Sequence, residues 1–329
     1  MTTKFARSGT YAALFIAGAA LIAIAATQFP SKSRAAEKPA SATATNASVG
    51  PETFATPEQA ATAMIDAAEK FDVPKLLKIV GSDGEDVVLT GEFAQDRERA
   101  KEVAALARKK MQVSLDPKTQ GRAYLIIGEQ DWPFALPIVK HGERWSFDAA
   151  AGRQELFNRR IGSNELDAIE VCRGFVEAQH DYLYITQRTG YEPAQYAQRI
   201  IASPGKHDGL AWKNADGTWA GPIGEKIAHA IEQGYNISGE AYRGYFFKVL
   251  KGQGPSAPLG RMDFVVQGAM IGGFALVAAP AEYGETGIKT FMVSHTGVVY
   301  EKDFGDNTLD AFQKMELFDP DKSWTVVSQ

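Results

Sequence analysis

The chain has 329 residues, 45% of them hydrophobic and 23% charged, and its formal net charge is −5 at pH 7. This balance is typical of a globular protein with room for two modest domains. The acidic surplus argues against a nucleic acid partner, and the single cysteine, Cys172, excludes an internal disulfide.

The first 35 residues have the three-part layout of a secretory signal peptide. Lys4 and Arg7 form a basic start, residues 11–27 are apolar and uncharged, and small residues favour cleavage after Ala35. An uncleaved anchor is the alternative, although the apolar run is slightly short of the ~20 residues that span a bilayer. Removing this segment takes away four basic residues and no acid, so the formal charge changes from −5 to −9. We therefore expect the folded part outside the cytoplasm, touching the membrane only through this segment if it is retained.

Residues 36–55 are rich in Ala, Ser, Thr and Pro and have no apolar period, which predicts a flexible linker. The patterns that follow predict helices over residues 57–71, 73–80 and 94–111, the first of them capped by Thr56. They then predict short strands over residues 123–128, 134–140 and 144–148, with His141 in a hairpin turn. Helices followed by a small antiparallel sheet indicate an α+β N-terminal domain over residues 56–160.

A long helix is predicted over residues 164–187, with Ser163 or Asn164 as its cap. Cys172 belongs to its apolar face, and His180 lies beside that face. Eight residues separate the two, which is about 12 Å along the helix axis, so they cannot pair for nucleophilic catalysis within this helix. We interpret Cys172 as a buried thiol, with a free reactive thiol as the alternative.

Residues 188–241 are predicted to be irregular, apart from a helix over 223–233. Long loops that carry aromatic residues are frequent places for binding sites. The candidate binding residues are therefore His207, Asp208, Trp212 and Trp219. A packed surface loop whose tryptophans cover the core is the alternative interpretation.

From Tyr242 onward the apolar residues alternate strictly, which predicts an antiparallel meander. Its strands are expected near residues 245–249, 262–266, 274–278, 291–293 and 298–302, and a closing helix near 308–318. His295 then lies at the tip of the last hairpin. Because its neighbours supply no positioned acid or nucleophile, it is interpreted as a turn residue rather than a catalytic base.

The sequence lacks the motifs of common catalytic sites. It contains no phosphate-binding loop with a following Lys-Ser or Lys-Thr and no Gly-x-Ser-x-Gly elbow, and its five histidines are scattered. We therefore predict no catalytic residues, no cofactor and no metal site.

Three long motifs carry a resemblance to a known family. They are NRRIGSNELDAIEVCRGFVEAQHDY (158–182), DWPFALPIVKHGERWSFD (131–148) and the stretch from YRGYFFKVLKGQGPSAPLG to VSHTGVVYEKD (242–303). They resemble the DUF2950 family of exported bacterial proteins of unknown function, over nearly all of residues 55–327. The resemblance implies a bacterial envelope protein and brings no catalytic residues. The final meander is also weakly similar to pilin-like or pseudopilin-like domains.

Together these observations predict an α+β protein. N-terminal helices with a small antiparallel sheet come first, followed by a long helix and a C-terminal antiparallel meander. The long helix, the irregular loop region after it and the meander together form residues 161–329. The predicted function is that of an exported envelope protein, a non-enzymatic binding or assembly module whose partner is another envelope protein or a small ligand. The alternatives are a periplasmic hydrolase acting on cell-envelope material, built around His207, Asp208 and Trp212, and a small-ligand carrier.

Overall fold

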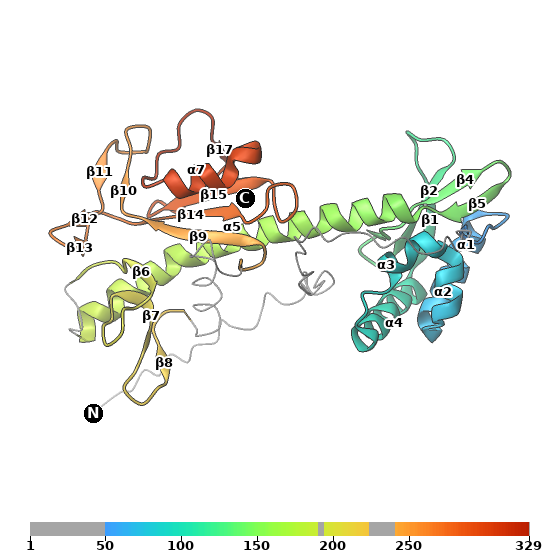
Figure 1. Ribbon diagram of the computed structural model, residues 1–329, viewed down its shortest axis with the longest axis horizontal. Coiled ribbons are helices and arrows are strands. Elements are labelled where there is room, and N and C mark those ends of the chain that lie inside the picture. The colour runs from blue at the N-terminus through green and yellow to red at the C-terminus, as the bar shows by residue number, and fades with distance from the viewer. Residues whose placement is uncertain (1–49, 190–193, 224–240, 329) are drawn as a thin grey trace, which may run out of the picture. The chain divides into compact units, whose positions relative to one another are not determined.

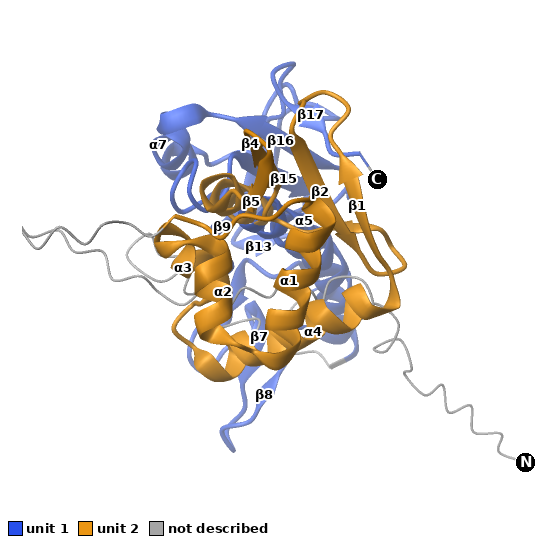
Figure 2. Cartoon of the chain, turned by 90° about the vertical axis from the view of Figure 1, so that its right-hand side faces the viewer, with its two compact units in different colours: residues 1–27, 160–329 blue, residues 28–159 orange. Residues whose placement is uncertain are grey.

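The computed structural model describes residues 50–189, 194–223 and 241–328 (Figure 1). These residues form two compact units, coloured separately in Figure 2: unit 2 holds residues 50–159, and unit 1 holds the described part of residues 160–328. The predicted signal peptide, and the predicted linker as far as residue 49, lie outside the described residues. Within the described ranges no helix is both long enough and apolar enough to cross a bilayer.

Unit 2 begins with a group of short helices. They are α1 (Pro57–Lys70), α2 (Val73–Val80), the 3₁₀ turn η1 (Ser82–Gly84), α3 (Glu85–Val88) and α4 (Phe93–Lys109). The Thr56 hydroxyl accepts the Gln59 N–H at 3.2 Å and so caps α1, as predicted. Phe71 ends this helix in the left-handed conformation, with φ of 49°, and the Asp72 carboxylate then caps α2. Local capping chemistry thus fixes the junction between these two helices.

An antiparallel sheet completes unit 2. Its strands are β1 (Met111–Leu115), β2 (Arg122–Ile127), β3 (Trp132–Pro133), β4 (Ile138–His141) and β5 (Arg144–Phe147). They are ordered β1-β2-β4-β5, with β3 also paired to β2. Alternate residues of β2 are buried in the core that α1 and α4 cover. The third helix ends at Lys109, two residues before the predicted end at Met111, and β1, whose residues are mostly exposed, was not predicted.

Residues 51–55, which were predicted to belong to the linker, contact the rest of unit 2. The backbone of Phe54 exchanges two hydrogen bonds with that of Trp145, at 2.7 and 2.9 Å. The Glu52 amide also donates to the Lys78 carbonyl. The first contact covers the β5 edge of the sheet, and the second attaches the segment to α2.

Helix α5 (Ala149–Thr189) is much longer than predicted and contributes residues to both units. It begins at Ala149, where the Asp148 carboxylate accepts the Ala151 N–H at 2.9 Å. Asn164, the predicted cap, lies inside the helix, and its side chain donates to the Thr286 carbonyl at 2.9 Å. A polar residue that suggested a helix start is therefore used for a tertiary contact.

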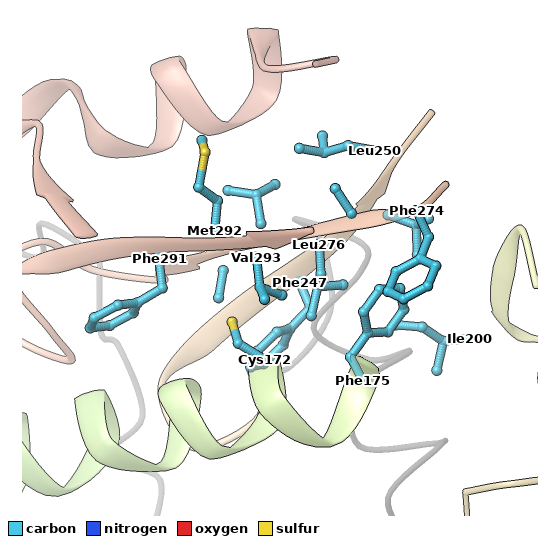
Figure 3. Close-up of a cluster of buried hydrophobic side chains, with 14 of the residues drawn as sticks. Cys172, Phe175, Ile200, Phe247, Leu250, Phe274, Leu276, Phe291, Met292 and Val293 are labelled. Atoms are coloured by element: carbon cyan, nitrogen blue, oxygen red, sulfur yellow. The ribbon is translucent and has the colours of Figure 1, made fainter. Parts of the chain in front are cut away.

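The core of unit 1 is a five-stranded antiparallel sheet, in which four of the five predicted meander strands are joined by an unpredicted fifth, β17. Its strands, each paired with the next, are β9 (Tyr245–Leu250), β14 (Ala275–Pro280), β15 (Lys289–Ser294), β16 (Val299–Asp303) and β17 (Thr325–Val326). Helix α5 covers one face, where Cys172 and Phe175 meet Phe247 and Phe291, while Met292 points to the opposite face (Figure 3). Helix α7 (Thr308–Lys314) lies against β14. Because both faces are covered, all six residues of β14 are buried.

Several short elements surround this sheet. They are β6 (Arg199–Ile201), β7 (Gly209–Lys213), β8 (Trp219–Ala220), β10 (Gly252–Gln253), β11 (Met262–Asp263), β12 (Val265–Val266), β13 (Ala269–Met270) and the 3₁₀ turn η2 (Gly305–Asn307). The segment predicted as the second meander strand, residues 262–266, forms small separate ladders instead. The parallel pair β6–β7 was not predicted. The helix predicted over residues 223–233 falls almost entirely outside the described residues. The α+β class is confirmed.

Candidate functional site

The structure brings two of the four predicted binding residues into direct contact. The rings of His207 and Trp212 meet edge to face, with centroids 5.1 Å apart. Trp212 is 4% exposed and also contacts Tyr182 of α5, whose hydroxyl donates to the His207 carbonyl. Trp219 lies in β8 opposite Lys213 of β7. Trp212 is therefore a buried packing residue that joins β7 to α5.

The carboxylate of Asp208 closes a turn. It accepts the Ser203 amide at 2.7 Å and the Ser203 hydroxyl at 2.8 Å, and Arg199 lies 3.8 Å away. This arrangement satisfies the backbone of the loop between β6 and β7. The Ser203 hydroxyl donates directly to the Asp208 carboxylate, with no imidazole between the two groups. Ser203, Asp208 and Arg199 therefore lack the geometry of a serine nucleophile with its base.

The two other reactive residue types lie in apolar surroundings. Burial raises the pKa of the fully buried Cys172 thiol to about 12. His295 follows β15 in the hairpin turn, as predicted, and its ring contacts Phe264 and Phe274. Burial, and then the charge of His180, lower the pKa of His295. The described residues contain no group of three or more His, Cys, Asp or Glu side chains placed to hold a metal ion.

A pocket of about 290 Å³ lies beside α5 in unit 1. Its apolar lining comes from Val171, Phe175, Ile200, Leu210, Ile223 and Leu276. Its polar lining comes from Asp167, Glu170, Tyr242 and Arg243. The volume is at the lower end of the range for small-molecule sites, and the combination of an apolar wall with a few polar groups is characteristic of them.

One face of α5 forms much of the pocket. Asp167, Glu170, Val171, Gly174 and Phe175 follow the i, i+3, i+4, i+7, i+8 spacing of a single helical face. A Cβ atom placed on Gly174 would meet nothing within 4 Å. Glycine in a helix interior costs about 1 kcal/mol relative to alanine, so its presence here calls for a reason. The missing side chain leaves part of the pocket open.

A strained turn carries the positively charged group. Arg243 has a φ of 48°, a left-handed conformation that non-glycine residues seldom adopt, and Gly244 follows it with a φ of 77°. The Arg243 guanidinium donates to the Asp167 carboxylate at 3.0 Å. Its pKa is raised by the hydrogen bond to Tyr242 and by the charge of Asp167, against the effect of burial.

The polar groups of the pocket carry a net negative charge. Arg243 is partnered by Asp167, whereas Glu170 has no salt bridge within 4 Å to any residue in the described ranges. A ligand with an apolar body would be stabilised by the lining, and a positively charged or hydrogen-bond-donating head would be stabilised by the carboxylates.

None of the four predicted binding residues lines this pocket, although Leu210 lies between Asp208 and Trp212 in the chain. The pocket has no continuous sequence motif, because its residues come from six separate segments of the chain. One local signal was present: a glycine in the middle of the long helix, on the face that carries Asp167 and Glu170.

Comparison with known proteins gives one match. Residues 51–327 match the family described as Protein of unknown function (DUF2950). No curated protein and no solved structure matches the chain. The weak similarity to pilin-like or pseudopilin-like domains is accordingly not borne out. Since the matched range covers most of the sequence, the chain belongs to the DUF2950 family of proteins of unknown function.

Proposed function

We propose that this protein is an exported component of the bacterial envelope and acts there as a non-enzymatic binding module for a small amphipathic ligand. The observation that carries the proposal is the pocket beside α5. Its wall is apolar, and its polar groups are gathered around Asp167, Glu170 and Arg243. The exported location is supported by the layout of residues 1–35 and by the resemblance of residues 55–327 to a family of exported bacterial proteins.

The polar groups favour one kind of ligand head. Two carboxylates and a single guanidinium line the pocket, and that guanidinium is already engaged by Asp167 at 3.0 Å. A protonated amine is therefore the preferred head, with an alkyl or aromatic body against residues such as Phe175 and Leu276. The periplasmic hydrolase is the weaker candidate, because the Asp208 carboxylate is occupied by Ser203 and Trp212 is buried.

Gly174 offers a way to fill the pocket without disturbing its neighbours. Substitution by leucine adds a side chain where a Cβ has open space, and it raises helix propensity. Gly162 is the matched control, since it also lies in α5 and its Cβ would meet nothing within 4 Å, but it does not line the pocket.

The test is thermal unfolding with octylamine, below its aggregation concentration, and with octanoate as the oppositely charged analogue. A ligand that binds only the folded state raises the melting temperature. We expect octylamine to raise it for the wild type and for Gly162→Leu but not for Gly174→Leu, with a smaller effect of octanoate. An equal rise in Gly174→Leu, or no rise with either compound, contradicts the pocket as the binding site.

Export is tested separately in the native cell. Fractionation followed by N-terminal sequencing should recover the chain outside the cytoplasm, beginning at residue 36 if the leader is cleaved. Recovery in the cytoplasmic fraction contradicts the proposed location.

A further inference from the structure

Strand β1 of unit 2 has an open edge. It pairs with β2 on one side, and no other described segment pairs with it. Its sequence, MQVSL, contains no charge and no proline, the devices that usually protect an edge strand from pairing with another chain. At the opposite edge of the same sheet, Phe54 is bonded to Trp145 of β5. The sheet is thus covered at one edge and uncovered at the other.

The ladder identifies which backbone groups face outward. The Lys110 carbonyl accepts the Gly128 N–H at 2.9 Å, and the Asp116 N–H donates to the Arg122 carbonyl at 2.8 Å. In an antiparallel pair the residues alternate between facing the partner strand and facing away. The amide and carbonyl groups of Met111, Val113 and Leu115 therefore point away from β2.

The side chains of these three residues lie on the core side of the sheet. They stand opposite Ile127, Leu125 and Ala123, which are all buried. Nevertheless Met111 is 38% exposed and Leu115 is 64% exposed, while Val113 is half-buried. The apolar face of the sheet consequently continues past the part that α1 and α4 cover, along the strand whose backbone is open.

The strand is complementary to itself. In an antiparallel pair centred on Val113, Met111 stands opposite Leu115 of the second copy, and each such pair exchanges two N–H···O bonds. Gln112 stands opposite Ser114, so polar residues meet polar residues on the outer face. Lys110, whose ammonium also pairs with Asp131 at 2.5 Å, stands opposite Asp116 at both ends of the pair, so no like charges meet there. In this register the outward-facing N–H and C=O groups of one copy bond to those of the other copy along the whole strand.

We propose that the protein forms a two-fold symmetric dimer through antiparallel pairing of β1 with β1 of a second copy. The two sheets then become one continuous sheet, and the apolar strip of Met111, Val113 and Leu115 is doubled. An isologous contact of this kind is self-limiting, because it uses the open edge of both copies. It is separate from the ligand pocket, which lies in unit 1, so failure of either proposal leaves the other intact.

Cysteine cross-linking of the full chain tests the register. Val113→Cys places two thiols across the two-fold axis, in a pair whose Cα atoms are about 5.5 Å apart, within the span of a disulfide. The natural Cys172 is fully buried and does not compete. Gln112→Cys is the matched control, since its side chain lies on the other face and opposite Ser114. We expect oxidation to link Val113→Cys into a dimer and to leave Gln112→Cys largely unlinked.

Sedimentation equilibrium of the same chain tests the dimer without a cross-link. Val113→Pro removes an outward N–H only, which an edge strand tolerates, and Val113→Lys sets like charges against each other at the axis. Both variants should be monomeric, whereas the wild type is dimeric. Because Val113 is half-buried against the core of unit 2, circular dichroism is used to select the variant that keeps the wild-type fold for this comparison. A wild type that stays monomeric at millimolar concentration overturns the proposal. So does a dimer that survives Val113→Lys, or a Val113→Cys variant that does not link.

Discussion

Replacing Gln179 by leucine should destabilise unit 1 strongly, although the change makes the core more apolar. Gln179 of α5 is 0% exposed. Its side-chain amide donates to the Ala197 carbonyl and accepts the Ala197 N–H, both at 2.8 Å. Ala197 is itself fully buried, so no water replaces these bonds in the variant. The side chain thereby holds the segment that leads into β6 and β7 against the long helix.

The size of the effect follows from the two groups left without partners. Each buried N–H or C=O that loses its partner costs about 1–3 kcal/mol, so the pair costs about 2–6 kcal/mol. The extra apolar surface of leucine returns about 1–2 kcal/mol. The difference spans about 0–5 kcal/mol, and we expect a net loss near its middle, about 2–3 kcal/mol, in the free energy of unfolding of unit 1.

Urea denaturation, combined with hydrogen exchange of the Ala197 amide, measures this loss. Gln187→Leu is the matched control, because Gln187 lies in the same helix and is exposed. It should change the stability by less than about 0.5 kcal/mol. If Gln179→Leu costs no more than Gln187→Leu, or leaves exchange at Ala197 unchanged, the reasoning from unsatisfied groups is refuted.

The isosteric variant Gln179→Glu adds a pH signature. An ionised carboxylate accepts the Ala197 N–H but cannot donate to the carbonyl, whereas a protonated one does both. The folded state therefore raises the pKa of this glutamate above its unfolded value of about 4.3. Relative to the wild type, the variant should be most stable below about pH 4 and should lose stability as the pH rises through the folded pKa. A deficit that is constant with pH would count against the proposed bonding.

Three further predictions concern the buried Cys172 and the half-buried His295 and Lys248. The pKa of His295 is lowered in the folded state, so its contribution to stability should be complete above about pH 6.5 and should fall as the pH drops through the lowered pKa. Urea titration of His295→Phe should therefore show a smaller loss of stability between about pH 7 and pH 5 than the wild type shows. An equal loss in the variant and the wild type would contradict this. Cys172, with a pKa raised to about 12, should resist Ellman's reagent in the native chain and react only after unfolding; rapid native labelling would show that the thiol is accessible. The Lys248 ammonium donates to the Phe312 and Gln313 carbonyls at the end of α7. Lys248→Met should therefore lower the free energy of unfolding by about 1 kcal/mol and speed amide exchange in α7. Unchanged exchange in α7 would contradict the capping role.

Local signals predicted much of the fold because they act within a few residues. Thr56 and Pro57 mark the start of α1, and alternation from Tyr245 onward marks the meander. The same kind of signal failed at Asn164, whose cap-forming side chain bonds instead to Thr286, a residue more than a hundred positions away. It failed at Met111 because β1 follows α4 after a single residue, and only Val113 in this strand is half-buried, so the alternation of its core side is weak.

The pocket was harder to predict than the fold because its residues are distant in sequence. Asp167 and Arg243 come together only when the turn before β9 is placed against α5. Conversely, His207 and Asp208 are adjacent in sequence but have different partners. The backbone carbonyl of His207 accepts the Tyr182 hydroxyl, whereas the Asp208 carboxylate accepts the Ser203 amide. An aromatic residue in a loop, such as Trp212, is as well explained by packing against Tyr182 as by a ligand.

The length of α5 has a practical consequence for dividing the gene into fragments. The boundary between the units falls at Arg159, inside an unbroken helix of 41 residues. A fragment that stops at Asp148 loses Gly152, which packs closely on Leu136, and Leu156, which packs on the core of unit 2. Helical ends fray when the turns beyond them are missing. Separate expression of either half therefore requires overlapping fragments, each carrying spare turns of this helix.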